Sequence, residues 1–318
     1  MLLAFLFIVG GLVVLVLGGE WLVKGAVAIS IRLGLPTLIT GLVVVGAATS
    51  MPEMVASLSA ALAGAPDIGW GNIAGSNIAN ILLILGAVAL LTPIPLRGIG
   101  RRDAVAGIMA AAFLYGITLA GVASIAIGFV FLVLLIVYVV WRYAASRKRG
   151  DVNAAGHDQH EFDDEATALT MGRTLFYLVI GVAGLVIGGN FLIDGSVIVA
   201  TRFGLSETVI GLTVVAIGTS LPELAASATA AYRGQPGLAL GNVLGSNIYN
   251  ILLIGGATML AAPSPVTSEL LDLELPLLLV SSLILWALLH FASRISRWMG
   301  AVLLAMFVGN TVYVLTIT

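Results

Sequence analysis

The chain repeats itself at a fixed offset, without a gap. Residues Gly18–Gly86 superimpose on Gly188–Gly256, and about half of the aligned positions are identical. The agreement is greatest in two polar patches, which are Thr49–Glu53 with Thr219–Glu223, and Gly71–Asn80 with Gly241–Asn250. We therefore expect two copies of one unit, residues 1–143 and 172–318, joined by a charged connection at 144–171.

The composition places both copies in a membrane. The 318 residues are 60% hydrophobic and 9% charged, with a mean hydropathy of +1.12, so too few charged side chains exist to cover a water-soluble globule. Runs of about 20 mostly apolar residues are long enough to cross the hydrocarbon as helices. Ten such runs occur, near 2–23, 37–62, 68–91, 103–121, 124–141, 173–199, 207–231, 237–261, 271–291 and 298–317. These runs predict an all-α polytopic membrane protein.

Five spans per copy is an odd number, so the second copy must enter the membrane from the side opposite to the first. The ten helices are therefore expected to form two inverted five-helix repeats. Arg202 falls on one side of the membrane, and all other basic residues fall on the other, namely Lys24, Arg32, Arg97, Arg101, Arg102, Arg142, Arg147, Lys148, Arg149, Arg173, Arg233, Arg294 and Arg297. By the positive-inside rule, both termini lie outside and the central loop is cytoplasmic, in a plasma (inner) membrane.

The connection at 144–171 is first basic and then acidic, with His157 and His160 between. Two histidines among carboxylates form a possible transition-metal site. A solvated, charged linker is the simpler interpretation of this composition.

Two glutamates, Glu53 and Glu223, lie in the middle of predicted spans, where ionisable side chains are costly and are functional candidates. Each follows a proline, Pro52 or Pro222, which cannot donate to the carbonyl four residues back, so the helix must bend or break there. Such a break frees carbonyls near Gly46–Ala48 and near Ala216–Gly218. Broken helices at membrane depth mark ion sites in transporters.

The side chains around these breaks offer oxygen atoms, with neither a thiol nor a deep histidine among them. Hydroxyls, carbonyls, amides and two carboxylates are ligands that suit hard cations such as Ca²⁺ and Na⁺. One Ca²⁺ neutralises the two glutamates Glu53 and Glu223. Without a bound ion, the two carboxylates would carry two negative charges in a dehydrated interior, which is costly. The site should therefore switch its access from one side of the membrane to the other only with cations or protons bound.

The helices that follow each break carry glycines and amides. Gly71, Gly75, Gly241 and Gly245 are best explained by close helix packing. Serine and asparagine four residues apart, Ser76 with Asn80 and Ser246 with Asn250, place two oxygens on one helix face. They serve either as ion ligands or only as interhelical hydrogen-bonding groups. Glu20, Lys24 and Asp194, nearer the span ends, fit a structural role.

These residues resemble the alpha repeats of the sodium/calcium exchanger family, in its compact prokaryotic form. The resemblance rests on Gly218–Glu223 (G-T-S-L-P-E), its variant at Ala48–Glu53 and both G-N-x-x-G-S-N-I-x-N strings, and it covers the whole chain. It implies discontinuous second, third, seventh and eighth helices around mid-membrane cation sites, with the first and sixth helices sliding past them. The ligands that it implies are Thr49, Ser50, Glu53, the Gly46 carbonyl, Ser76, Asn80, Thr219, Ser220, Glu223, the Ala216 carbonyl, Ser246 and Asn250.

Two positions depart from the family pattern. Ala48 replaces a glycine of the string, and Asn250 stands where some members and the potassium-dependent exchangers carry aspartate. The second change weakens the case for potassium cotransport, and the absence of the glutamate of the proton-coupled branch favours Na⁺ over H⁺. The resemblance implies a secondary antiporter that exchanges Ca²⁺ for Na⁺, with a Ca²⁺/H⁺ or K⁺-dependent exchanger as the alternative.

Other classes fit less well. A calcium channel normally repeats around an axis through its pore, whereas inverted repeats suit alternating access. An intramembrane metalloprotease needs H-E-x-x-H and an aspartyl protease needs two intramembrane aspartates, and the sequence has neither, so we do not expect an enzyme. The expected partners are Ca²⁺, Na⁺ and the lipid bilayer, with no cofactor, nucleic acid or obligatory protein partner.

Overall fold

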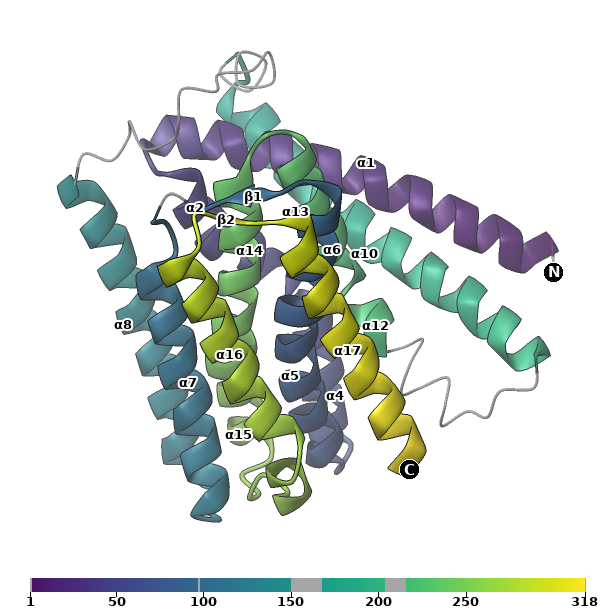
Figure 1. The fold of residues 1–318 in the computed structure, drawn as a ribbon, viewed down its shortest axis with the longest axis vertical. Helices are drawn as coiled ribbons and strands as arrows, with labels where there is room; N and C mark the ends of the chain where they lie inside the picture. The colour runs from purple at the N-terminus through teal and green to yellow at the C-terminus, as the bar shows by residue number, and fades with distance from the viewer. Residues whose placement is uncertain (1, 97, 150–167, 204–215, 318) are drawn as a thin grey trace.

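A computed structural model describes residues 2–96, 98–149, 168–203 and 216–317. The first copy comprises α1 (Leu2–Leu33), α2 (Thr37–Thr40), η1 (Gly41–Val45), α3 (Gly46–Thr49), α4 (Met51–Leu62), α5 (Pro66–Ala79), η2 (Asn80–Ile84), α6 (Leu85–Leu91), β1 (Ile94–Pro95), α7 (Arg101–Leu119) and α8 (Ile125–Arg149). The second comprises α10 (Met171–Arg202), α12 (Ala216–Thr219), α13 (Leu221–Tyr232), α14 (Pro236–Tyr249), η5 (Asn250–Ile254), α15 (Gly255–Ala261), η6 (Ser268–Leu271), α16 (Glu274–Phe291), β2 (Arg294–Ile295) and α17 (Arg297–Ile317). The protein is therefore almost entirely helical (Figure 1).

Eight helices in the described residues are long and apolar enough to cross a membrane, and a bent pair adds a ninth span. In the bent pair, Thr37–Thr49 and Met51–Leu62 meet at 43°. The described part of the predicted span at 207–231 is α12 and α13, and residues 204–215 lie outside the described chain. The helical class is confirmed, while the count of ten and the inverted-repeat arrangement stay predictions.

The predicted bend in the second span occurs at Ser50. Its backbone leaves the helical region, with φ −78° and ψ 3°, and Pro52 occupies the first turn of α4. The second copy breaks in the same way at Ser220, with φ −89° and ψ 6°, just before Pro222 in α13. Proline is tolerated in the first turn of a helix because its missing N–H has no partner there anyway.

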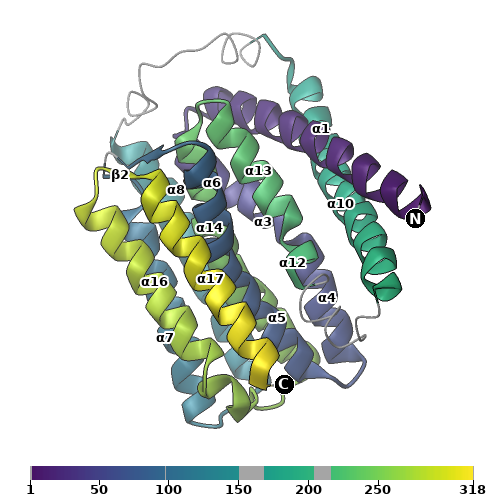
Figure 2. The same ribbon diagram turned by 45° about the vertical axis from the view of Figure 1, so that its right-hand side comes forward.

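The helices divide into a buried centre and flanking layers. In α5–α6, 78% of the membrane-length window is buried, and in α14–α15 83%, whereas the other candidate spans reach at most 39%. Helices α7, α8, α16 and α17 flank this centre, and α1 and α10 pack along each other on its other side (Figure 2). Ser76 on α5 and Ser246 on α14 are therefore buried within protein, whereas Asp67 at the start of α5 is exposed.

Small residues bring α1 and α10 into close contact. A Cβ added to Gly18 would lie 2.7 Å from the backbone nitrogen of Leu185, and one added to Gly181 would lie 2.5 Å from that of Leu22. Neither position has room for a larger side chain. At these positions the two long helices thus pack backbone against backbone, as small residues allow in membranes.

The central helices of the two copies, α5–α6 and α14–α15, run in opposite directions. In Figure 1, the chain runs through α5 and α6 toward the end that carries β1 and β2, and through α14 and α15 away from it. The strands pair antiparallel, with Ile94 opposite Ile295. The sequence analysis contained no strand, because two-residue segments carry no periodic signal. This ladder ties the loop after α6 to the loop after α16.

The first six residues of the predicted connection, 144–149, are helical. Helix α8 continues to Arg149, past the predicted boundary at residue 143, because Ala144, Ala145 and the basic residues after them favour a helix. His157 and His160 lie outside the described residues, so the predicted linker and the possible metal site there stay untested.

Candidate ion-binding site

The predicted site residues gather at the two helix breaks and on the two central helices. Glu53 and Glu223 are each 1% exposed, although they lie in an apolar bundle. Thr219 is half-buried, and the other predicted ligand side chains are buried to the same degree as the glutamates, namely Thr49, Ser50, Ser76, Asn80, Ser220, Ser246 and Asn250. The fold thus buries all of these side chains except that of Thr219, which is half-buried.

Contacts across the two copies join these groups into one site. The hydroxyl of Thr49 donates to Asn242 Oδ1 at 3.1 Å and lies 3.4 Å from the hydroxyl of Ser246. The hydroxyl of Ser50 donates to Glu223 Oε1 at 3.5 Å, at the long end of the hydrogen-bond range. The break in the first copy therefore faces both the central helix and the glutamate of the second.

Of the carbonyls expected to be free near Gly46–Ala48, that of Gly46 accepts hydrogen bonds in the described structure. It accepts the Ser50 N–H at 3.2 Å and the Ser246 hydroxyl at 3.5 Å. At the equivalent position of the second copy, the Ser220 N–H donates to Ile217 O at 3.1 Å instead. Proline removes only its own donor, and the turn rearranges around it, so the carbonyl that loses a partner is not determined by spacing alone.

In each copy, an asparagine side chain bonds the backbone carbonyl of the glutamate and the hydroxyl of a serine. Asn72 Nδ2 donates to Glu53 O at 3.3 Å and to Ser57 Oγ at 2.9 Å. Asn242 Nδ2 repeats this with Glu223 O and Ser227 Oγ at the same distances. The sequence analysis did not assign these asparagines and serines to the site. Their identity in both copies, at a fixed spacing from the glutamate, was the signal that could have found them.

The site contains buried polar atoms that lack a hydrogen-bond partner within the described part of the chain. They are Glu53 Oε2, Glu223 Oε2, Ser220 Oγ, Asn77 Oδ1, Asn80 Oδ1, and both Oδ1 and Nδ2 of Asn250. Each such atom costs about 1–3 kcal/mol when it stays unsatisfied, so a native structure that clusters them implies a missing partner. All but one of these atoms are oxygens, and a cation is the partner that oxygens share.

The carboxylates alone do not form a cluster typical of a tight metal centre. Among the described residues, no three or more histidines, cysteines or acidic residues lie together so that they could hold a metal ion. Two carboxylates with neutral hydroxyls and amides suit an ion that must bind and leave. This donor set agrees with the hard-cation interpretation of the sequence.

The glycines of the second copy have the predicted packing role. A Cβ on Gly241 would lie 2.2 Å from Leu38 O, and one on Gly245 would lie 2.4 Å from Leu42 O. These glycines let α14 contact η1 and α2 closely enough for Ser246 to reach the first break. Among the described residues, none comes within 4 Å of a Cβ added to Gly71 or Gly75, so the same role in the first copy stays a prediction.

Three charged groups at the span ends lie apart from these ligands, as expected for structural residues. Glu20 pairs with Arg233 at 2.5 Å, and Lys24 lies 5.4 Å from the centre of the Tyr177 ring. Asp194 is exposed on α10. These contacts connect α1 to its neighbours.

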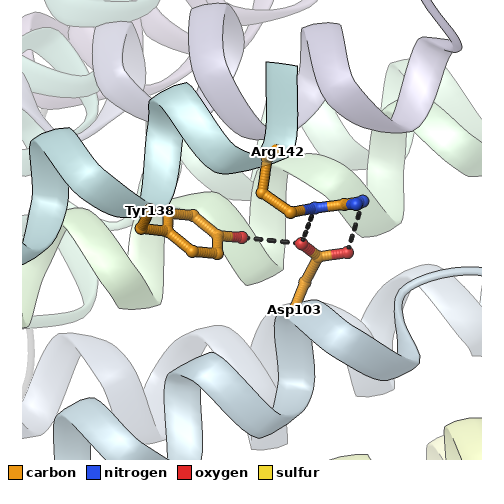
Figure 3. A network of polar contacts seen from close by, with 3 residues as sticks. All are labelled: Asp103, Tyr138 and Arg142. Atoms are coloured by element: carbon orange, nitrogen blue, oxygen red, sulfur yellow. Dashed lines mark hydrogen bonds and ion pairs between the residues drawn. The ribbon is translucent and has the colours of Figure 1, made fainter. Parts of the chain in front are cut away.

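A buried ion pair that the sequence analysis missed links α7 to α8 (Figure 3). Arg142 contacts both carboxylate oxygens of Asp103, at 2.5 and 3.0 Å, and the Tyr138 hydroxyl donates to the same carboxylate at 2.7 Å. Asp103 is 1% exposed. Its partner Arg142 lies 39 residues away, just past the predicted span at 124–141, so spacing gave no sign of the pair.

Comparisons with known proteins agree with this geometry. The family model of the sodium/calcium exchanger protein matches residues 3–144 and 173–316. The sodium/calcium exchanger MaX1 of Methanosarcina acetivorans is 33% identical over 96% of both chains. The inner membrane protein YrbG of Escherichia coli strain K12 is 32% identical over 89% of this chain and 88% of its own.

A solved structure has the same fold. The sodium-calcium exchanger NCX_Mj, soaked with zero Na⁺ and Ca²⁺, superimposes with a TM-score of 0.81 at 30% identity, over 98% of this chain and 99% of its own. The family model and the full-length likenesses cover both copies with their helix breaks. The chain therefore belongs to the sodium/calcium exchanger family.

Proposed function

We propose that the protein is a secondary antiporter that exchanges Ca²⁺ for Na⁺ across the plasma membrane by alternating access. The observation that carries the proposal is the pair Glu53 and Glu223, buried at two helix breaks, each with a carboxylate oxygen that lacks a partner among the described residues. Relatives that align over nearly the whole chain are sodium/calcium exchangers by name.

The charge of the site explains why transport is coupled. An empty pair of carboxylates in a dehydrated interior is costly, so the protein changes sides with one Ca²⁺ or with Na⁺ ions bound. Either load compensates the two negative charges. Exchange is thereby obligatory, and a leak without a counter-ion is suppressed.

The proposed ligands are those implied by the sequence. Glu53 and Glu223 hold Ca²⁺ directly, and the hydroxyls, amides and two carbonyls complete the Ca²⁺ and Na⁺ sites. The set is Thr49, Ser50, Glu53, Gly46, Ser76, Asn80, Thr219, Ser220, Glu223, Ala216, Ser246 and Asn250. Burial of the described side chains and the contacts between the two copies support this assignment.

The proposal includes two inverted five-helix repeats with both termini outside. The opposite directions of α5–α6 and α14–α15 support inversion (Figure 1). The carboxyl end of α1 and the amino end of α17 both lie at the end of the molecule that carries the β ladder (Figure 1). This arrangement supports two chain termini on the opposite side of the membrane from the ladder. Arg101, Arg294 and Arg297 lie beside or in the ladder, which supports a cytoplasmic location for this end under the positive-inside rule.

Radioactive Ca²⁺ uptake into proteoliposomes tests the function, with gradients of Na⁺, K⁺ and H⁺ imposed one at a time. Uptake that requires Na⁺ on the side opposite to Ca²⁺ is the expected result. Uptake driven by H⁺, or dependent on K⁺, would support the alternative exchangers. A Ca²⁺ conductance without a counter-ion would indicate a channel and contradict the proposal.

A further inference from the structure

Two asparagines outside the proposed ligand set, Asn77 and Asn247, occupy equivalent positions in the two copies. Each lies three residues before a proposed ligand, Asn80 or Asn250. Asn77 is 0% exposed and Asn247 is 6% exposed. A carboxamide has two donor hydrogens and an acceptor oxygen, so its partners determine which way the group is turned.

On one side of the site, an amide bridge joins the two copies. Asn80 Nδ2 donates to Asn247 Oδ1 at 2.9 Å, and Asn247 Nδ2 donates to the main-chain oxygen of Asn77 at 3.4 Å. Asn247 thus uses both of its polar atoms. Because the nitrogen of Asn80 is committed to this bridge, its Oδ1 is turned away from Asn247, and that oxygen has no partner among the described residues.

The equivalent bridge on the other side is open. Helix α5, which contains Asn77, packs against η5, which begins at Asn250. This contact is equivalent to that of α14 with η2, which contain Asn247 and Asn80. Asn77 Nδ2 instead donates to Ile73 O of its own helix at 2.7 Å. Within the described chain, Asn77 Oδ1 and both polar atoms of Asn250 lack a partner. An acceptor and a donor that could satisfy each other are left unpaired.

We propose that Asn77 and Asn247 are positioning residues, and that the Asn80–Asn247 and Asn77–Asn250 bridges form alternately as the site changes sides. This inference rests on the proposed exchange function and its inverted repeats, which make the second access state the mirror of the first. In the observed state, the closed bridge orients Asn80 and leaves Asn250 free to turn toward an ion. In the mirror state, these roles are exchanged.

The bridges are a two-state element at the centre of the molecule, of the kind that switching transitions require. Each bridge orients one ligand in one access state. Loss of a single bridge should therefore weaken ion binding on one face of the membrane and leave the other face unaffected. A residue that only supports packing would weaken both faces together.

The test compares Asn247→Leu with Asn77→Leu, since leucine keeps the branched shape and removes the amide. The apparent KM for Ca²⁺ is measured during Na⁺-driven exchange in right-side-out and in everted membrane vesicles. Each variant should raise KM on one face by about fivefold, the factor that corresponds to one ordinary hydrogen bond. The affected faces should be opposite in the two variants.

Ser282→Ala is the matched control, because this buried hydroxyl bonds only within its own helix, to Leu278 O at 2.8 Å in the described structure. It should leave KM unchanged on both faces. Should the leucine variants fail to reach the membrane, Asn247→Ser and Asn77→Ser remove the bridges with a short polar side chain. Amounts in the membrane are compared before transport is measured.

A double-mutant cycle separates positioning from packing. Adding Asn247→Leu to Asn80→Ala should raise KM no further, whereas adding Asn77→Leu should raise KM on the opposite face. If a leucine variant raised KM equally on both faces, or if the effects of Asn80→Ala and Asn247→Leu were additive, the proposal of alternating bridges would be wrong. The proposed exchange function would not be affected by that result. An unaltered protein without Na⁺-driven Ca²⁺ flux would overturn the proposed function, and the bridge inference with it.

Discussion

Ser50 of the first copy donates its hydroxyl to the Glu223 carboxylate of the second, across 3.5 Å. The two residues are 173 positions apart, and each lies at the break of a different bent segment. The contact makes a single ion site out of two repeated halves. A change in either half should therefore alter the binding of the same ion.

Glu53→Gln and Glu223→Gln should each abolish Ca²⁺ exchange. Removal of one carboxylate leaves a dication half-compensated in a dehydrated site, and breaking a buried charge pair costs about 3–5 kcal/mol, or more than a hundredfold in affinity. Transport in proteoliposomes and the amount of inserted protein are measured together. A properly inserted variant with near-native exchange would show that the two-glutamate site is wrong.

The proposed topology predicts the accessibility of tags. Tags at the amino terminus and after Thr318 should be reached from outside, and a tag inserted at Gly156 only from the cytoplasm. Protease protection in intact and everted vesicles measures this directly. Termini on opposite sides would rule out an odd number of spans per copy, and the inverted repeats with it.

Asn250 limits the proposed site to two carboxylates. Potassium should therefore not stimulate transport by the unaltered protein, because a large cation needs a wide, well-charged cage. Asn250→Asp adds a third negative charge, which should lower the KM for Ca²⁺ and slow turnover because release becomes harder. Na⁺-driven Ca²⁺ uptake with and without K⁺ measures both effects. An unchanged KM in the variant would place Asn250 outside the ion site.

The buried pair of Asp103 and Arg142 should matter for stability rather than for ion selectivity. Asp103→Asn leaves the guanidinium buried without its counter-charge, which should destabilise the protein by about 3–5 kcal/mol. The double variant Asp103→Leu/Arg142→Met removes both charges and should recover most of the loss. Thermal unfolding in detergent compares the three proteins. A double variant as unstable as the single one would contradict this account.

The contact between α1 and α10 depends on glycine at particular positions. Gly18→Ala should destabilise the protein by about 1–3 kcal/mol, because the added methyl group overlaps the backbone of α10. Gly10→Ala is the matched control on the same helix, since no described atom lies within 4 Å of its added Cβ. Thermal unfolding of both variants decides the point. Alanine favours a helix more than glycine does, so Gly10→Ala should not lose stability. Equal losses of stability in both variants would show that contact with α10 does not explain the effect.

Much of the fold followed from local properties of the chain. Apolar runs predicted where the helices lie, because the length of a membrane span is set by the thickness of the hydrocarbon. Helices α1 and α8 nevertheless extend to Leu33 and Arg149, past the predicted ends at 23 and 141. The break before Glu53 was predictable for the same kind of reason, since proline lacks the donor that a helix needs wherever it stands. The duplication indicated that both glutamates belong to one repeated feature, and the oxygen-rich side chains around them indicated a hard cation.

The tertiary structure decided which of these groups meet. The Gly46 carbonyl is bonded to Ser50 and Ser246, and Asn247 rather than a second ligand orients Asn80. The pairing of Asp103 with Arg142 likewise had no sequence signal. Such contacts join residues tens to hundreds of positions apart, and the two copies, with nearly the same local sequence, satisfy their hydrogen bonds differently. Local sequence determines where a helix runs and breaks, whereas the partners of a buried amide depend on how whole helices pack.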